Sequence, residues 1–531
     1  KELKQRADSL RLSLDSLETK FSMRKSSPVP FSFIVKLQSD ATAKSKREDI
    51  TNLFEQKSFG GVVGLTDTNK LIVALDSLEE LKEVANRIND YEINDYAISC
   101  IEDFEEFVPY IVKGKKECNY KIKLVDYQNY EQNLAMRRRL EHTLNKEGID
   151  YTKTDYSEEY YIYKLRNITE KSLDVLKKAD IFNALFSIEP MPKYKVSLDC
   201  LKSDNNIPIK KPDDEKMYIT IGILDNGIAN IPHLSPWMEM DRWSPYPKTS
   251  INPTHGTFVS GIALYGDECE GKIWVDHKGL KIFDAAVFPD VTKEGLDEDE
   301  LIANIKDVIR LYHEKVKIWN LSISITREVI DTKFSDFAIA LDSIQDEYNV
   351  LICKSAGNCE NFTVSRPKGR IHEGADSVRS LVVGSVAHKK GKYDYAEVND
   401  PSPFSRVGPG PEYIIKPEVS HYGGNAGIDP KGRVVTSGVK SFSKEGELAQ
   451  GVGTSFSTPR ITALAAGLQQ ELNEDFDQLL LKALIIHSAS YPEDMSVPIT
   501  ERTKQVGFGI PKSVPEIIYN SPYEATLILR D

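Results

Sequence analysis

The most informative part of the sequence is the stretch GVGTSFSTPRITALAAGL, residues 451–468. Proline is tolerated in the first turn of a helix, so Pro459 indicates a helix that begins near Ser455. The small residues Gly and Ala that follow allow such a helix to pack closely. The first backbone N–H groups of a helix lack partners within it and carry its positive dipole. The stretch therefore predicts a closely packed helix with a serine at its N-terminus.

Upstream of this stretch, as far back as Met217, short apolar runs alternate with helical segments. The expected elements, in chain order, are a strand at Tyr218–Leu224, a helix from about Gly256, then Leu280–Phe288, Leu301–His313, Val316–Ile323, Phe337–Tyr348, Val350–Lys354 and Leu381–Val386. Strands that are apolar throughout and separated by helices predict an α/β domain with a doubly wound parallel sheet. Active sites in such sheets lie at the carboxyl ends of the strands.

Four polar side chains stand at the ends of these elements. They are Asp225 in YITIGILDNGI (218–228), His255 in NPTHGTFVSGIAL (252–264), Asn358 in VLICKSAGN (350–358) and Ser455. A serine nucleophile needs a base, histidine can take and return the proton, and a carboxylate orients the imidazole. An amide nitrogen can stabilise the oxyanion. Taken singly, each of the four is equally explained as a turn residue or a helix cap.

Taken together, the motifs resemble those of the subtilisin-like serine proteases (subtilases). The segments that carry the resemblance, from Tyr218 to Pro511, are DNGI, HGT, KIWNLSIS, SAGN, FSRVGPG, KPEV, GTSFSTP and GFGIPK. The resemblance implies a subtilisin-like catalytic domain with the triad Asp225, His255 and Ser455, and with Asn358 as oxyanion donor. It also implies a set of substrate-binding residues: Leu321, Ser322, Ile323, Ser324, Ser355, Ala356 and Gly357.

Two positions depart from the family pattern. Asn226 stands where the family usually has Ser or Thr, which is a conservative polar change. Ser324 stands where the substrate-binding strand usually ends in glycine. A side chain there would crowd the pocket for the residue before the scissile bond, so the cleavage specificity does not transfer from the family.

The N-terminal half predicts two small α+β modules in tandem, each with the order βαββαβ that is typical of ferredoxin-like folds. For the first, residues 31–112, we expect strands Phe31–Leu37, Val62–Leu65, Leu71–Leu75 and Tyr96–Ile101, with helices Lys46–Glu55 and Leu78–Ile88. For the second, residues 119–192, we expect strands Tyr120–Val125, Tyr151–Thr154, Tyr160–Leu165 and Leu185–Ile188, with helices Gln132–Lys146 and Glu170–Ala179. Neither module carries a cluster of catalytic side chains.

Four further segments complete the expected domain map. Residues 1–27 carry apolar residues at heptad spacing and predict an amphipathic helix that packs on the next domain or docks a partner. Residues 193–217 are polar and aperiodic and predict a linker. The catalytic domain is expected over 218–520, and residues 521–531 read as the start of a truncated C-terminal β segment.

The composition excludes several classes of protein. The 531 residues carry a net charge of −13 and no long basic block, which disfavours nucleic-acid binding. No apolar run is long enough to span a membrane. The six cysteines include no CxxC pair, which favours reduced thiols and a cytoplasmic setting. The acidic run Asp297–Glu300 raises the question of structural calcium, but carboxylates at the front of a helix complement its dipole and explain the run without metal. We predict no catalytic metal, and the proposed chemistry requires no cofactor.

Two hypotheses of function follow. The first is a serine endopeptidase that acts on polypeptides and is restrained by its N-terminal modules, because subtilase propeptides share the βαββαβ order. The second is a non-catalytic or partner-activated assembly protein on the same fold. Its N-terminal helix and modules would then serve self-association or recruit a partner, and the resemblance suggests an AAA-type ATPase as one such partner.

Overall fold

The computed structural model describes most of the chain. The described residues are 2–23, 28–41, 47–55, 61–114, 118–166, 168–194, 201–202, 207–290, 295–323, 327–359, 369–473, 475–518, 526 and 528. They form two compact units, one of Lys1–Thr154 and Tyr161–Met191, the other of Asp155–Tyr160 and Pro192–Asp531. The expected β segment at 521–531 lies outside the described residues except for two isolated positions, and neither of these is in a strand.

The first unit begins with a four-stranded antiparallel sheet in the order β2-β3-β1-β4. Its strands are β1 (Phe31–Leu37), β2 (Gly61–Asp67), β3 (Lys70–Leu75) and β4 (Ile101–Glu106). The accompanying helices are α1 (Glu2–Met23), α2 (Arg47–Phe54), α3 (Leu78–Asn89) and α4 (Asp95–Cys100). The strand expected at Tyr96–Ile101 is therefore wrong. Ala97, Ile98 and Cys100 are buried from a short helix instead, and the strand starts only at Ile101.

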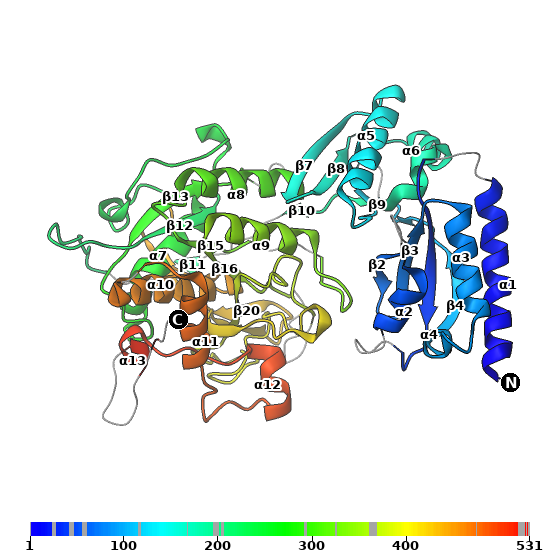
Figure 1. Cartoon of the computed structure of the whole chain (residues 1–531). Helices are drawn as coiled ribbons and strands as arrows, with labels where there is room; N and C mark the ends of the chain where they lie inside the picture. The colour runs from blue at the N-terminus through cyan, green and yellow to red at the C-terminus, as the bar shows by residue number, and fades with distance from the viewer. Residues whose placement is uncertain are drawn as a thin grey trace. The chain divides into compact units, whose positions relative to one another are not determined.

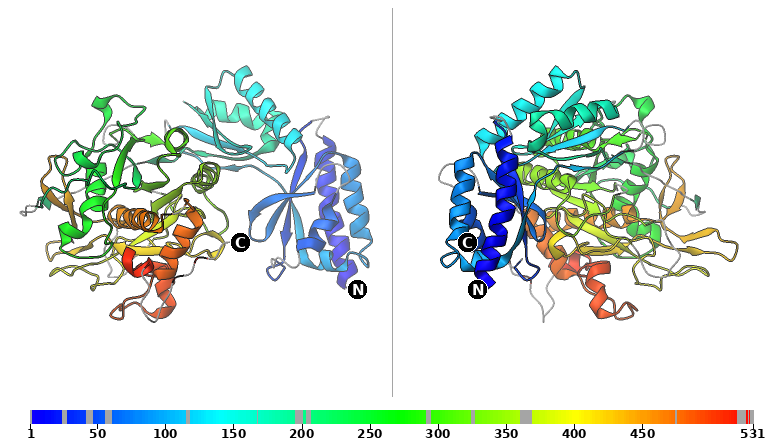
Figure 2. Two further views of the ribbon diagram at one scale, coloured as in Figure 1. Left: turned by 60° about the vertical axis from the view of Figure 1, so that its left-hand side comes forward. Right: turned by 90° about the vertical axis from the view of Figure 1, so that its right-hand side faces the viewer.

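Helix α1 packs on the first module. Ala7, Leu10, Leu14 and Leu17 are buried in the same hydrophobic core as Phe31. The heptad stripe is thus occupied by the helix's own unit, and α1 runs along α3 in each view (Figures 1 and 2). This arrangement favours the simpler of the two roles expected for residues 1–27.

The second module has a five-stranded sheet in the order β5-β9-β6-β8-β7. Its elements are β5 (Tyr110–Ile111), β6 (Tyr120–Leu124), α5 (Tyr130–Lys146), β7 (Tyr151–Ser157), β8 (Tyr160–Leu165), α6 (Glu170–Lys178), a 3-10 turn (Asp180–Ala184) and β9 (Leu185–Pro190). The expected order βαββαβ is present, with β5 added at the edge. Residues of both modules, such as Ile34 and Ile122, share one hydrophobic core.

The second unit is built on a six-stranded sheet whose neighbouring strands are all parallel, in the order β13-β12-β15-β16-β17-β18. The strands are β12 (Thr220–Asp225), β13 (Lys281–Ala286), β15 (Ile318–Leu321), β16 (Leu351–Ser355), β17 (Leu381–Val386) and β18 (Val419–Tyr422). The helices are α7 (Thr254–Glu270), α8 (Glu298–Tyr312), α9 (Asp336–Tyr348) and α10 (Thr454–Leu472). Helices α8 and α9 cover one face, and α7 and α10 cover the other (Figure 1). The expected α/β class is confirmed.

Close packing at the centre of this sheet explains a glycine in strand β12. The ring of Trp319 on β15 is fully buried. A β-carbon on Gly222 would lie 2.1 Å from Cε3 of that ring, so any side chain would clash. Dense apolar packing of this kind fixes where β12 and β15 end, and therefore where Asp225 and Ser322 stand.

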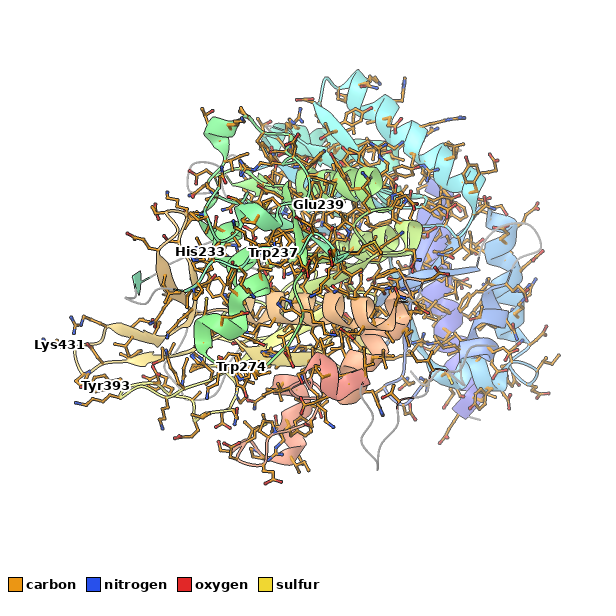
Figure 3. The ribbon with its side chains drawn as sticks, turned by 90° about the vertical axis from the view of Figure 1, so that its left-hand side faces the viewer. His233, Trp237, Glu239, Trp274, Tyr393 and Lys431 are labelled. Carbon is orange, nitrogen blue, oxygen red and sulfur yellow. The ribbon has the colours of Figure 1, made fainter. Side chains whose placement is uncertain are left out.

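Smaller elements complete the unit. They are β10 (Lys193–Tyr194), β11 (Leu201–Lys202), β14 (Leu296–Asp297), β19 (Asn425–Ile428), β20 (Val434–Ser437), β21 (Val439–Phe442), β22 (Leu448–Gly451), α11 (Gln478–Ser488), α12 (Ile499–Val506), α13 (Val514–Ile518) and 3-10 turns at Ser235–Trp237, Lys248–Ser250 and Pro411–Tyr413. In Figure 3, Lys431, in the turn of the hairpin β19–β20, and Tyr393 lie at the same edge of the second unit.

The segment 193–217, expected as a linker, is partly structured. Strand β10 pairs antiparallel with β14, and β11 pairs antiparallel with β22. Further along, the Lys210 carbonyl accepts from the indole N–H of Trp237 at 3.0 Å. His233, which lies near Trp237 in Figure 3, contacts the Ile207 carbonyl through Nε2 at 2.8 Å. Both ends of the segment are therefore held on the second unit.

Candidate active site

The three residues expected to form a catalytic triad stand at the carboxyl edge of the parallel sheet. Asp225 ends β12, His255 is the second residue of α7, and Ser455 is the second residue of α10. All three are buried. The ring of Phe456, directly after Ser455, lies 5.8 Å from the His255 imidazole, centre to centre. The fold thus brings together residues that are 230 positions apart in the chain.

Asp225 and His255 form a direct pair. Nδ1 of His255 lies 2.8 Å and 3.0 Å from the two carboxylate oxygens of Asp225. The backbone N–H of Asn226 also donates to Asp225, at 2.8 Å. The side-chain oxygen of Asn226 accepts from the N–H of Gly256 at 3.2 Å, which ties the end of β12 to the start of α7. Asn226 therefore supports the pair in spite of its departure from the family pattern.

Asn358 is oriented by the residue before Ser455. Its side-chain oxygen accepts from the backbone N–H of Thr454 at 2.9 Å and from the Thr454 hydroxyl at 3.0 Å. These two bonds fix which end of the amide is oxygen, so Nδ2 is left to donate. A β-carbon on Gly453 would approach that Nδ2 to 3.2 Å, and glycine keeps this space open.

A chain of buried hydrogen bonds fixes the segment beside Ser455. The Ser455 hydroxyl donates to the carbonyl of Ser322 at 3.0 Å, and the Ser322 hydroxyl donates back to the Ser455 carbonyl at 3.0 Å. The Asn320 amide donates to the Ser322 hydroxyl at 2.9 Å, and Asn320 accepts from Thr462 on α10 at 3.0 Å. Four side chains thus lock β15 to α10.

The other expected substrate-binding residues lie on two segments that flank this point. Leu321 ends β15 and is buried, and Ser322 and Ile323 follow it. Ser355 ends β16 and donates to the Ile323 carbonyl at 3.3 Å, and Ala356 and Gly357 continue toward Asn358. Ser324 lies outside the described residues.

Sequence reasoning missed two ionisable groups near this edge. Burial lowers the pKa of Lys354, on β16, to about 7. Burial raises the pKa of Asp284, on β13, to about 6. Asp284 accepts from Arg242 Nε at 2.6 Å and from the Ile228 N–H at 3.0 Å, so it holds the loop after Asp225. Both groups could have been found from the sequence, because a single charged residue interrupts each of the apolar runs KIFDAAV and VLICKSAGN.

No metal cluster accompanies the site in the described part of the chain. Within it, no group of three or more His, Cys, Asp or Glu side chains is placed to hold a metal ion. In the acidic run Asp297–Glu300, the Glu298 carboxylate accepts from the Tyr156 hydroxyl at 3.0 Å. Among the same described residues, no helix is both long and apolar enough to cross a membrane.

The family comparison agrees with this geometry. The model of the subtilase family matches residues 217–510, which is more than half of the chain and contains all four candidate residues. The chain belongs to the subtilase family. Members of the subtilase family are serine proteases.

Three proteins similar to this subtilase share 13–30% sequence identity with it. The uncharacterized protein y4bN of Sinorhizobium fredii is 30% identical over 234 residues, which are 37% of this chain and 53% of that protein. The match thus spans about half the length of this curated relative. The epidermin leader peptide processing serine protease of Staphylococcus aureus is 13% identical over 78% of this chain and 100% of its own, with a TM-score of 0.48. Fervidolysin of Fervidobacterium pennivorans, a keratinolytic enzyme, is 13% identical over 78% of this chain and 63% of its own, also with a TM-score of 0.48.

Proposed function

We propose that this subtilase is a serine endopeptidase that works through the triad Asp225, His255 and Ser455. The observation that carries the proposal is the buried pair in which both oxygens of Asp225 lie within 3.0 Å of Nδ1 of His255. A carboxylate on Nδ1 keeps the proton there, so the second ring nitrogen stays free to act as a base. Packing alone does not require an aspartate, a histidine and a serine at this one edge.

The reaction begins with a rotation of the Ser455 hydroxyl. It donates to the Ser322 carbonyl in the resting structure, and rotation about χ1 turns it toward the imidazole. His255 then removes the hydroxyl proton while Ser455 attacks the peptide carbonyl, and it returns that proton to the leaving amine. Asp225 stabilises the imidazolium that forms in between. Water then hydrolyses the acyl-enzyme with His255 again as base.

The oxyanion of each tetrahedral intermediate is held by two donors. One is Nδ2 of Asn358, whose oxygen is already engaged by Thr454. The other is the backbone N–H of Ser455, in the first turn of α10, where N–H groups lack helical partners. Because both donors are fixed before substrate arrives, they cost little reorganisation during the reaction.

Replacement of single serines on α10 tests this assignment. Ser455→Ala should abolish peptide hydrolysis, because the nucleophile is gone, and leave the melting temperature near that of wild type. Ser457→Ala is the matched control, since Ser457 lies in the same turn and donates only to the Thr454 carbonyl, at 3.0 Å. Equal hydrolysis by Ser455→Ala and wild type would refute the proposal and favour an assembly protein on this fold.

We also propose that the segment containing β10 and β11 restrains the intact enzyme. Strand β11 pairs with β22, which ends at Gly451, four residues before Ser455. Strand β10 pairs with β14, which leads directly into α8. A substrate peptide that adds a strand at either place would have to displace this segment.

A specific cut separates inhibition from simple partner binding. A protease recognition site placed in the exposed stretch Asp213–Lys216 would release the segment from the catalytic chain. Inhibition predicts a gain in peptide hydrolysis after the cut. The same site placed in the exposed turn Lys431–Gly432 should give no gain. If the uncut chain is as active as the cut one, the two N-terminal modules bind partners or substrates instead.

A further inference from the structure

A buried lysine joins the two segments that flank the candidate nucleophile. Lys354 is 0% exposed. Its amine donates to the carbonyl of Ile323 on one segment and to the carbonyl of Ser355, at 3.0 Å, on the other. The carbonyl next to Ile323, that of Ser322, receives the Ser455 hydroxyl. The Lys354 amine therefore bridges the segment after β15 and the end of β16.

Acidic groups of the protein compensate the positive charge of the Lys354 ammonium only weakly. In the described part of the chain, no carboxylate forms an ion pair with Lys354. The acidic group that acts on it is Asp376, whose oxygens already accept from the Ser335 N–H at 2.6 Å, the Ser335 hydroxyl at 2.7 Å and the Gly374 N–H at 2.8 Å. Burial raises the pKa of Asp376. A buried ammonium that donates only to neutral oxygens, here two carbonyls and the Ser355 hydroxyl, favours an anion beside it.

A histidine and an arginine pack beside the second segment, Ser355–Asn358. The His372 ring packs on Gly357, where a β-carbon would lie 2.6 Å from its Nδ1. His372 is 5% exposed, and neither of its ring nitrogens has a hydrogen-bond partner among the described residues. Arg406 donates to the Asn358 carbonyl at 2.8 Å and to Glu328 at 2.6 Å. Burial, followed by the charges of Arg406 and Lys354, lowers the pKa of His372 to about 3.

We propose that this site selects substrates with an acidic side chain, Glu or Asp, immediately before the scissile bond, and that Lys354 is the residue that determines this specificity. The proposal rests on the function assigned above. When Ser455 attacks a carbonyl whose oxygen is held by Asn358, the side chain of that residue enters between Ser322–Ile323 and Ser355–Gly357. A carboxylate there compensates the Lys354 charge and accepts from the neutral His372 ring. An apolar or basic side chain leaves the ammonium uncompensated.

The direct test uses the full chain and peptides that differ only at that residue. Substrates with Glu, Gln, Leu and Lys before the scissile bond should give the highest kcat/KM for Glu. Because Glu and Gln have the same shape, their ratio isolates the charge, and we expect it to be about tenfold or more. Equal rates for Glu and Gln, or a preference for Leu or Lys, would overturn the proposal.

A methionine substitution assigns the effect to Lys354. Lys354→Met keeps the length of the side chain and removes its charge, so the Glu and Gln substrates should become equal. Lys416→Met is the matched control. Lys416 is also buried, but its amine is paired with Glu418 at 2.5 Å, so the control should keep the wild-type ratio. A Lys354→Met enzyme that still prefers Glu by the wild-type ratio would refute the role of Lys354.

The pH dependence of the wild type needs no substitution. The Lys354 amine loses its proton as pH rises through its pKa of about 7, so the Glu/Gln ratio in kcat/KM should be high at pH 6 and fall toward pH 9. His372, whose pKa is lowered to about 3, stays neutral over this range, and the Gln substrate cancels every pH effect that both substrates share. A ratio that is flat or rises with pH contradicts the proposal.

A fluorophosphonate probe distinguishes failure of the specificity proposal from failure of the triad assignment. A fluorophosphonate reacts with an activated serine whatever the peptide specificity. If Ser455 is labelled but Glu is not preferred, the specificity proposal alone fails. If Ser455 is labelled neither in the intact chain nor after a cut at Asp213–Lys216, the triad assignment fails and the specificity proposal fails with it.

Discussion

Removal of the Asn358 amide is the most informative single perturbation of the reaction. Asn358→Ala deletes one of the two oxyanion donors while leaving Asp225, His255 and Ser455 in place. Removing one such donor from a preorganised site raises the barrier by about 2.7–4 kcal/mol, which corresponds to a loss of about 10²–10³ in kcat. KM should change little, because the oxyanion exists only in the transition state and the intermediate.

A second substitution, at Thr454, gives a smaller expected loss with which the loss for Asn358→Ala can be compared. The Thr454 hydroxyl makes one of the two bonds that orient Asn358, at 3.0 Å, while the Thr454 N–H makes the other, at 2.9 Å. Of these two bonds, Thr454→Val removes only the first, together with the bond that the hydroxyl accepts from the Gly357 N–H at 3.2 Å. A neutral hydrogen bond is worth about 0.5–1.5 kcal/mol, so kcat should fall by about two- to tenfold. The loss should therefore be much smaller than for Asn358→Ala.

Steady-state kinetics on one peptide substrate, with melting temperatures for each variant, test both numbers. We expect kcat to fall in the order wild type, Thr454→Val, Asn358→Ala, with KM nearly constant. If Asn358→Ala keeps a kcat within about threefold of wild type, or if its whole loss appears in KM, Asn358 is not an oxyanion donor.

Three further outcomes follow from the geometry. Asp225→Asn should lower kcat by about 10⁴-fold with an unchanged melting temperature, because the amide favours the wrong tautomer of the catalytic histidine, and a loss under tenfold would contradict this. Burial raises the pKa of Cys353 to about 12, so iodoacetamide at pH 8 should modify the half-buried Cys118 first, and peptide mass spectrometry showing the reverse order would count against the buried position of Cys353. Gly222→Ala puts a β-carbon 2.1 Å from the Trp319 ring, so it should destabilise the fold by about 1–3 kcal/mol and lower the melting temperature, and an unchanged melting temperature would show that the two strands are packed less tightly there.

Much of the fold was predictable because the sequence signals are local. The parallel sheet follows from apolar runs separated by helices, and β12, β15 and β16 end at Asp225, Leu321 and Ser355, each within two residues of the expected end. The four candidate site residues were predictable for the same reason, since each stands at the end of an element and carries a reactive group. Their catalytic roles still depend on the experiments above.

The failed strand in the first module shows where local patterns mislead. The run Tyr96–Ile101 is apolar and looks like a strand, yet most of it forms the last turn of a short helix. The strand that follows, Ile101–Glu106, buries only Ile101 and Phe104 and is otherwise charged or exposed, so its alternation is hidden. Its partner β1 decides the outcome through backbone pairing from Phe33↔Glu106 to Leu37↔Ile101, and no local pattern reveals such pairing.

Lys354 was missed for a related reason. Lys354 stands in an apolar strand, and the sequence shows only that it is charged. Its role depends on the parallel pairing of Leu321 with Lys354, which brings the amine to the Ile323 carbonyl. Such a contact joins residues 31 positions apart and exists only once the sheet is formed. The proposal on cleavage specificity therefore had to come from the structure.

Labelling of Ser455 by a fluorophosphonate tests the central claim most directly. Peptide mass spectrometry should find the adduct on Ser455, and both Ser455→Ala and His255→Ala should lose it while Ser457→Ala keeps it. If Ser455 is labelled only after the cut at Asp213–Lys216, the result supports both the assigned nucleophile and the proposed restraint of the intact chain. A folded chain that takes no label at Ser455, cut or uncut, would contradict the account.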